Sequence, residues 1–415
     1  MTHSKFPLSS RRPAATPEAP SRRKALGSLS GLGLLAAGCG GAGDLAGVGS
    51  GGTGQIASFS FGAISGFGSV IVNGIKYDDS KARVTDDLGA PRDLSQLGIG
   101  MVVEIDGDSD DSSGLGSARS VRIVSELRGP VRSVNRAAGQ FTALGLTIEP
   151  NASTVWSGIR DLSALIPGTT VVEVWGFANR DNRILIATRI EAVTSTTPRA
   201  KLRGVVELFS QSPPSIRIGT QQINLDRIEV LPAGLKQGAW VQVDSSMPPD
   251  DTTPWRVDQI RMVESGLVNA AKAARLEGRI YNYQSASAFQ LAGLTINASQ
   301  ATYEGGSASN LSNGVRVRID ATIQSNGVAL ATRVRLRSDD SSNEDEKEVK
   351  GKVFRYAGLS DFSIRDGSNR EFLINASQAR IDNGGPADIK VGASLEIKGS
   401  PSGNLLNATR IKLSD

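Results

Sequence analysis

The sequence predicts an all-β fold: about five tandem small β-barrels of the OB-like type, after a signal peptide and a glycine-rich tether. Short strands with alternating polar and apolar residues recur from Phe59 to the end of the chain, which indicates repeated modules. The glycines that open four successive copies are separated by 75, 74 and 73 residues: Gly129, Gly204, Gly278 and Gly351. This spacing favours a small barrel in each copy over the alternative, a propeller blade, which usually repeats at about 40–50 residues.

The first 38 residues have the layout of a secretory signal peptide. A basic segment, SRRK at residues 21–24, precedes a weakly apolar run that ends at Gly38. The run is shorter than the roughly 20 residues that a membrane-spanning helix needs. Residues 1–38 are therefore expected to direct export and to be removed.

Two short motifs refine this prediction. The sequence LAAGC at residues 35–39 resembles a lipobox, in which Cys39 would receive a lipid and become the mature N-terminus. The pair Arg22 and Arg23 resembles a twin-arginine export signal. The resemblance implies a protein anchored to the membrane through lipid, on the periplasmic or outer-membrane face of the cell envelope.

Residues 39–58 are rich in glycine and predict a flexible tether. A phosphate-binding loop would need a Gly-Lys-Ser/Thr ending, which this stretch does not contain.

The copies that follow share a series of elements. A hairpin comes early, as in FTALGLTI at residues 141–148 and FQLAGLTI at 289–296, where a glycine makes the turn. A single helical turn is expected near the middle, at RDLSQL (92–97) and RDLSAL (160–165), because Asp is a favourable N-cap. Five or six short strands with a helical turn after the third or fourth is the order of an OB-like barrel.

The copies divide the chain into modules at residues 59–127, 128–199, 200–265, 276–338 and 349–415. The alanine-rich stretch 266–275 predicts a short connecting helix, and the acidic stretch 338–348 predicts a linker. We therefore expect the modules to unfold separately. Four apolar residues are expected at matching core positions: Val172, Val241, Val317 and Ile397.

The segment GFGSVIVNGIKY at residues 66–77 resembles the opening of the bacterial domain of unknown function 5666 family. Members of that family are exported proteins with tandem copies of a β-domain. The resemblance covers most of the chain after residue 59, and copy three departs from it most. It implies compartment and fold, and it brings no catalytic residues with it.

Composition excludes several kinds of chemistry. The only histidine is His3 and the only cysteine is Cys39, so the folded body has neither imidazole nor free thiol. Catalysis by Ser-His-Asp or Cys-His, and the usual zinc, haem and iron–sulfur sites, are therefore excluded, and no cofactor is expected. From Cys39 onward the chain carries 40 basic and 41 acidic residues, so nucleic acid is an unfavoured partner.

Asp106, Asp108 and Asp110 alternate as carboxylates do at the start of a calcium loop. An EF-hand would need Gly and Glu where Asp111 and Ser117 stand, so a solvated hairpin tip is the favoured interpretation.

Four aromatic residues are candidates for stacking on nucleic-acid bases, but their positions on or beside strands favour a core role for the tryptophans: Trp156, Trp175, Tyr281 and Tyr283. The triplet Asn-Ala-Ser recurs at Asn151, Asn297 and Asn375, which favours a turn over a glycosylation site.

The leading functional hypothesis is a non-enzymatic cell-envelope lipoprotein that displays tandem binding or spacer modules to an unknown envelope protein or polymer. The alternative is an OB-like protein that binds a polymer, either glycan or single-stranded nucleic acid. A hydrolase that uses a pair of carboxylates is the third hypothesis.

Overall fold

The computed structural model describes residues 56–415 except 111, 180–182, 195–198, 250–253, 264–272, 339–345, 403–404 and 415. The signal peptide, Arg22, Arg23 and Cys39 lie outside the described residues. So do most of the tether, of the alanine-rich stretch and of the acidic linker.

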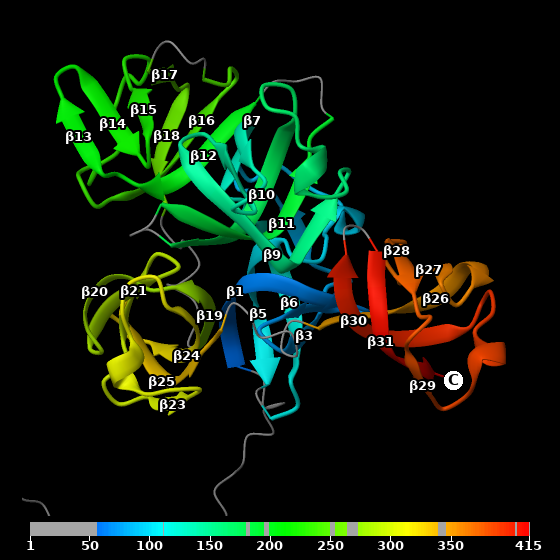
Figure 1. Cartoon of the computed structure of the whole chain (residues 1–415). Coiled ribbons are helices and arrows are strands. Elements are labelled where there is room, and N and C mark those ends of the chain that lie inside the picture. Colours follow the sequence, from blue (N-terminus) through cyan, green and yellow to red (C-terminus); the bar gives the residue numbers. More distant parts are fainter. Residues whose placement is uncertain are drawn as a thin grey trace, which may run out of the picture. The chain divides into compact units, whose positions relative to one another are not determined.

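The described chain is all-β and forms five repeats in sequence order (Figure 1). The first contains β1 (Ile56–Phe67), β2 (Val70–Val72), β3 (Ile75–Asp78), β4 (Arg83–Thr85), β5 (Val102–Asp110) and β6 (Leu115–Ile123). The second contains β7 (Leu127–Asn135), β8 (Gln140–Ala143), β9 (Leu146–Ser157), β10 (Val171–Asn179) and β11 (Ile184–Ala192). The third contains β12 (Ala200–Val205), β13 (Leu208–Gln211), β14 (Pro214–Ile218), β15 (Gln221–Asn224), β16 (Trp240–Ser245), β17 (Trp255–Arg256) and β18 (Gln259–Met262).

The last two repeats follow the same order. The fourth contains β19 (Ala273–Arg279), β20 (Tyr281–Ser285), β21 (Ala288–Leu291), β22 (Leu294–Asn297), β23 (Thr302–Glu304), β24 (Arg316–Ile323) and β25 (Ala329–Leu336). The fifth contains β26 (Lys347–Gly358), β27 (Asp361–Arg365), β28 (Glu371–Asn375), β29 (Arg380–Asp382), β30 (Ser394–Ser402) and β31 (Leu405–Ser414).

The helical turn predicted near the middle of a copy is a short 3₁₀ turn. Four of them occur in the described part of the chain: η1 (Leu94–Gln96), η2 (Leu162–Ala164), η3 (Ala308–Asn310) and η4 (Pro386–Asp388). Asp161 caps η2 as predicted, because its carboxylate accepts a hydrogen bond from the Ser163 backbone N–H. Among the described residues, no helix has the length and apolar character that crossing a membrane requires.

The second repeat shows how each barrel closes. Strands β7, β8 and β9 form an antiparallel meander, β9 pairs in parallel with β11, and β11 pairs with β10, which returns to β7. This circuit is the five-stranded barrel expected of an OB-like module. The first, fourth and fifth repeats close in the same way. The third repeat departs from the pattern, since its strands fall into two sheets.

Local turn chemistry explains why the hairpins form. Leu144 and Gly145 both have positive φ, 46° and 76°, as a two-residue hairpin turn of the tight type requires. Ala292 and Gly293 repeat this geometry in the fourth repeat. In all three Asn-Ala-Ser triplets the asparagine side-chain oxygen accepts hydrogen bonds from the backbone N–H and hydroxyl of the serine: Asn151, Asn297 and Asn375. The predicted turn is confirmed at Asn297 and Asn375, which end β22 and β28, whereas Asn151 lies within β9 at an irregularity of its pairing with β11.

The repeats are joined by strand pairing as well as by the covalent chain. The N-terminal part of β1 pairs with β5 of its own barrel on one edge, and its other edge pairs in parallel with β19, from Ser58–Ala273 to Phe61–Leu276. Farther along, β1 pairs in parallel with β26, and β7 pairs with β12. In each case the first strand of one repeat covers the open edge of another first strand. The expectation that linkers alone join the modules is therefore wrong.

The apolar core is divided into two clusters that each extend over several repeats. One combines the first, fourth and fifth repeats with Val155, Trp175 and Phe177 of the second. The other combines the second and third repeats. The four core residues predicted from the sequence are all fully buried: Val172, Val241, Val317 and Ile397.

Candidate functional site at the junctions between repeats

The aromatic candidates are mostly core residues. Trp156, Trp175 and Tyr281 are 7%, 3% and 4% exposed, as the interpretation of the tryptophans as core predicted. Tyr281 is covered by the ring of Trp240 from the third repeat, with the ring centroids 5.9 Å apart. Tyr283 is partly buried and packs against a core phenylalanine. These rings therefore serve packing within and between repeats.

Asp106, Asp108 and Asp110 lie along β5 near the hairpin that leads to β6. Arg119 donates to both carboxylate oxygens of Asp106 and, at 2.6 Å, to Asp108. Asp110 instead accepts hydrogen bonds from Ser112 and Ser113, and these hydrogen bonds lower its pKa. The Arg119 guanidinium thus already binds Asp106 and Asp108, two of the three carboxylates that would have to bind a metal cation. Within the described ranges, no group of three metal-ligating side chains comes together.

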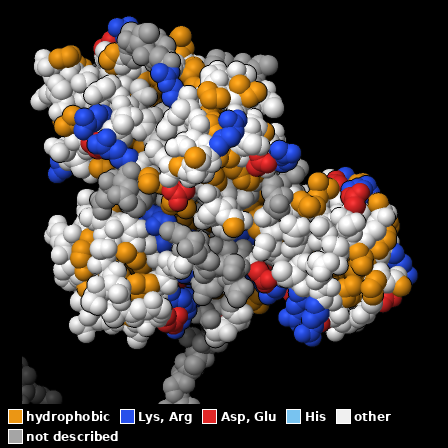
Figure 2. Space-filling model, viewed as in Figure 1, with side chains coloured by type: hydrophobic (Ala, Val, Ile, Leu, Met, Phe, Trp, Pro, Cys, Tyr) orange, Lys and Arg blue, Asp and Glu red, His pale blue; other side chains and the backbone are white. Residues whose placement is uncertain are grey.

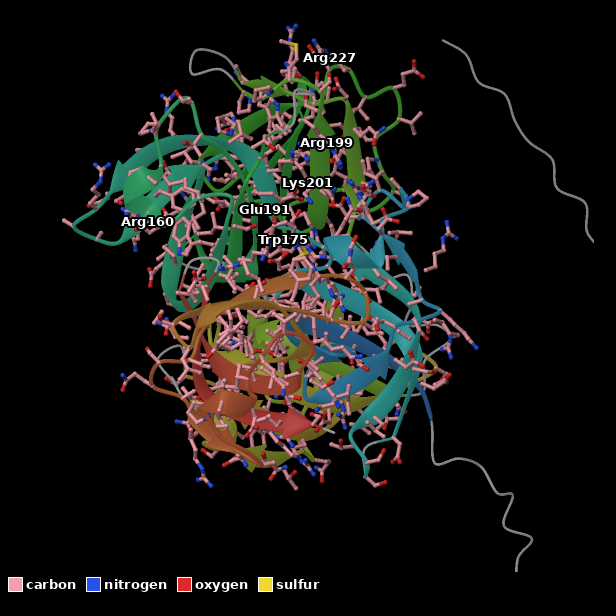
Figure 3. The ribbon with its side chains drawn as sticks, turned by 90° about the vertical axis from the view of Figure 1, so that its right-hand side faces the viewer. Arg160, Trp175, Glu191, Arg199, Lys201 and Arg227 are labelled. Atoms are coloured by element: carbon pink, nitrogen blue, oxygen red, sulfur yellow. The ribbon has the colours of Figure 1, made fainter. Side chains whose placement is uncertain are left out.

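A buried ionic network joins the first three repeats. Lys201 on β12 donates to Asp87 at 2.6 Å and hydrogen-bonds the hydroxyl of Ser125. The Ser125 hydroxyl in turn donates to Glu173 on β10. Arg199 donates to Asp244 at 2.8 Å beside this pair, and Figure 3 shows Arg199 and Lys201 in neighbouring positions.

Asp87 remains ionised in this setting. Its burial alone would raise the pKa, but the positive charges of Lys201, Arg203 and Arg199 outweigh burial and lower the pKa to about 2. No local sequence pattern predicts this network, because Asp87 and Lys201 stand 114 positions apart.

Arg189 of β11 fastens the second repeat to the first. Its guanidinium donates to Glu191 through two nitrogens and to the backbone carbonyl of Ile99 through the third. The neighbouring Thr188 hydroxyl donates to the carbonyl of Gly100. A Cβ at Gly98 would lie 2.9 Å from the Arg189 guanidinium carbon, so a larger residue there would displace the guanidinium.

Arg370 fastens the fifth repeat to the first. Its guanidinium carbon lies 3.6 Å from the centroid of the Phe67 ring, and it donates to Asp366 and to the carbonyl of Leu94. Phe372, which like Arg370 belongs to the fifth repeat, packs on Phe67 of the first, with 5.6 Å between the ring centroids.

Two cavities of about 430 Å³ open where repeats meet. One lies between the first and fifth repeats and is lined by charges of both signs, Lys76, Glu348 and Lys350 among them. The second lies where the first, second and fifth repeats meet, and its wall combines Gln96, Glu191 and Phe372 with several aliphatic side chains. A sequence pattern cannot reveal such sites, because their walls are assembled from distant repeats.

Comparisons with known proteins find a match for three of the five repeats. The family model for a domain of unknown function, DUF5666, matches residues 128–191, 277–335 and 350–412, which fall in the second, fourth and fifth repeats. A solved structure described as "drosophila Unr CSD456" is similar over 51% of this chain and 96% of that chain, with 14% sequence identity and a TM-score of 0.15. None of the curated proteins matches the chain.

Proposed function

We propose that this chain, whose second, fourth and fifth repeats match the DUF5666 family model, is a non-enzymatic lipoprotein of the cell envelope. Its β-barrel repeats act as binding or spacer modules. Cys39 carries the lipid, and Arg22 and Arg23 belong to the export signal.

The observation that carries this proposal is the pairing between first strands of different repeats. Because β1 pairs with both β19 and β26, the outer surfaces of three barrels keep a fixed spacing. Residues 52–415 accordingly form one compact unit. Fixed spacing suits a module that holds partners apart or presents several weak contacts at once.

Two other observations argue against binding to single-stranded nucleic acid. Stacking needs exposed rings, and three of the four aromatic candidates are buried under neighbouring side chains. On the face shown in Figure 2, lysine and arginine side chains lie in several small groups and form no continuous stripe. Glycan binding does not need such a stripe.

Metabolic labelling with palmitate tests the anchor. The full chain, expressed in a host that processes lipoproteins, is expected to take up label and to fractionate with membranes. Cys39→Ser should lose both properties while keeping the circular dichroism spectrum of the β-body, since Cys39 precedes that body. Equal labelling of the two proteins, or no label in either, would contradict the proposal.

A further inference from the structure

The cavity where the first, second and fifth repeats meet has the size and wall of a small-molecule site. Its volume is about 430 Å³, within the range of roughly 300–1,000 Å³ that such sites occupy. Apolar side chains from two repeats form much of the wall, among them Val155, Trp156, Phe372 and Leu405. Figure 3 shows Glu191, which also lines it, on the side of the second repeat that borders the other repeats.

Two polar side chains in this wall, Glu191 and Gln96, each use one atom in a hydrogen bond within the protein. Each has a second polar atom that can bond a ligand. Both hydrogen bonds that Glu191 receives, from Arg189, go to its Oε2 atom. Among the described residues no donor reaches its Oε1 atom. Gln96 accepts a hydrogen bond from the backbone N–H of Asp93 through its side-chain oxygen, so its amide N–H₂ remains available. The cavity thus presents one fixed acceptor and one fixed donor beside an apolar surface.

The charges around the cavity cancel. Arg189 pairs with Glu191 at 2.7 Å, Arg370 pairs with Asp366, and Glu371 receives a hydrogen bond from Arg365. An anionic or cationic ligand would find no uncompensated partner here, and its desolvation would be unfavourable. The wall therefore suits a neutral molecule that combines hydroxyl groups with an apolar face.

We propose that this cavity binds a neutral saccharide. A sugar ring has hydroxyls around its rim, each able to donate and accept, and C–H groups on its faces. The rim matches Glu191 Oε1 and the Gln96 amide, and the C–H face matches the apolar wall around Phe372. This inference deepens the proposed function, since it names the class of ligand for a binding module.

The site is shared between repeats, which sets its behaviour. Arg189 holds Glu191 in position and also donates to the carbonyl of Ile99 in the first repeat, so the position of the acceptor is linked to the contact between the two repeats. Arg189 is thus a positioning residue. Binding should stabilise the junction, because ligand that binds the folded state alone shifts unfolding to higher temperature.

Isothermal titration calorimetry of the mature chain with two neutral probes, maltotetraose and the tetramer of N-acetylglucosamine, tests the proposal. At least one probe should bind and should raise the melting temperature. Gln96→Ala and Glu191→Gln should each weaken that binding about tenfold, as expected for the loss of one hydrogen bond to the ligand. Gln324→Ala, an exposed glutamine in the fourth repeat, is the matched control and should bind as the wild type does.

Lack of binding to both probes at millimolar concentration would overturn the proposal, and so would equal binding by all four proteins. If either site variant unfolds, Ser157→Ala in the same wall supplies a second test, with melting temperatures measured for each. Absence of saccharide binding would not change the palmitate labelling at Cys39. Failure of this inference can therefore be distinguished from failure of the proposed function.

Discussion

The ammonium of Lys201 lies 2.6 Å from the Asp87 carboxylate, and the two side chains are only 3% and 7% exposed. This pair crosses the border between the first and third repeats. Taking both charges out of water is costly, and the cost is offset only while each has its partner. The junction therefore depends on both residues together.

Asp87→Asn should destabilise the protein strongly. The substitution leaves Lys201 buried without its closest counter-charge, and breaking such a pair costs about 3–5 kcal/mol in the free energy of unfolding. Urea unfolding followed by circular dichroism measures the change. Asp361→Asn, in an exposed pair with Arg355, is the control and should leave the free energy nearly unchanged. A loss below 1 kcal/mol for Asp87→Asn would contradict the interpretation.

Stability should fall in acid because of the same carboxylate. The pKa of Asp87 is about 2 in the folded protein against 3.8 ordinarily, so its contribution is complete above about pH 5 and disappears as pH falls toward 2. The loss should be about 2 kcal/mol. Glu277, whose burial is outweighed by Arg318 and Arg316, has a pKa lowered to about 2 and adds to the same trend. Unfolding free energies measured from pH 6 to pH 2 should show a shallower slope for Asp87→Asn.

Trimming a core residue should weaken several repeats at once. Val317→Ala removes buried apolar surface from the cluster shared by the first, fourth and fifth repeats and should cost about 1–3 kcal/mol. Val241→Ala should cost a similar amount in the cluster of the second and third repeats. Hydrogen exchange should show lost protection across each shared cluster. Protection lost only in the substituted repeat would favour independent modules instead.

The hairpin turn of the second repeat contacts the third repeat, and a pair of glycine substitutions separates the two effects. Gly145 and Gly139 have similar positive φ angles, 76° and 68°, so alanine at either position should cost about 1 kcal/mol in strain. At Gly145 the added Cβ would also lie 2.4 Å from the backbone nitrogen of Gln221, whereas at Gly139 no atom lies within 4 Å. Chemical denaturation should therefore show a larger loss for Gly145→Ala. Equal losses would mean that the third repeat moves away without cost.

Calcium should not bind measurably to the Asp106–Asp110 hairpin while Arg119 is present, because the Arg119 guanidinium forms ion pairs with Asp106 and Asp108. Arg119→Gln frees both carboxylates and should create a weak, millimolar site detectable by calorimetry. Adding Asp106→Asn to that variant should abolish the heat of calcium binding. Binding of calcium to the unmodified chain would show that Arg119 yields to the ion.

Local patterns in the sequence were enough to predict the barrels. The alternation of apolar residues, the turn at Gly145 and the Asn-Ala-Ser turns each depend on neighbours only a few positions away. The junctions could not be predicted in this way. Lys201, Arg189 and Arg370 resemble ordinary solvated charges in sequence, and their partners belong to other repeats. Repetition predicted copies of one domain, but it carried no information on how those copies pair.

The parallel pairing of β1 has a consequence for the order in which the chain can fold. Residues 58–61 are made early during synthesis, yet the strand that covers their open edge begins only at residue 273. Until then a nascent chain presents an unpaired strand edge, which is a template for association with other chains. Contacts this distant along the chain also slow folding. A protein truncated before β19 would keep that edge exposed permanently, so the first repeat alone should be more prone to aggregate than the complete chain.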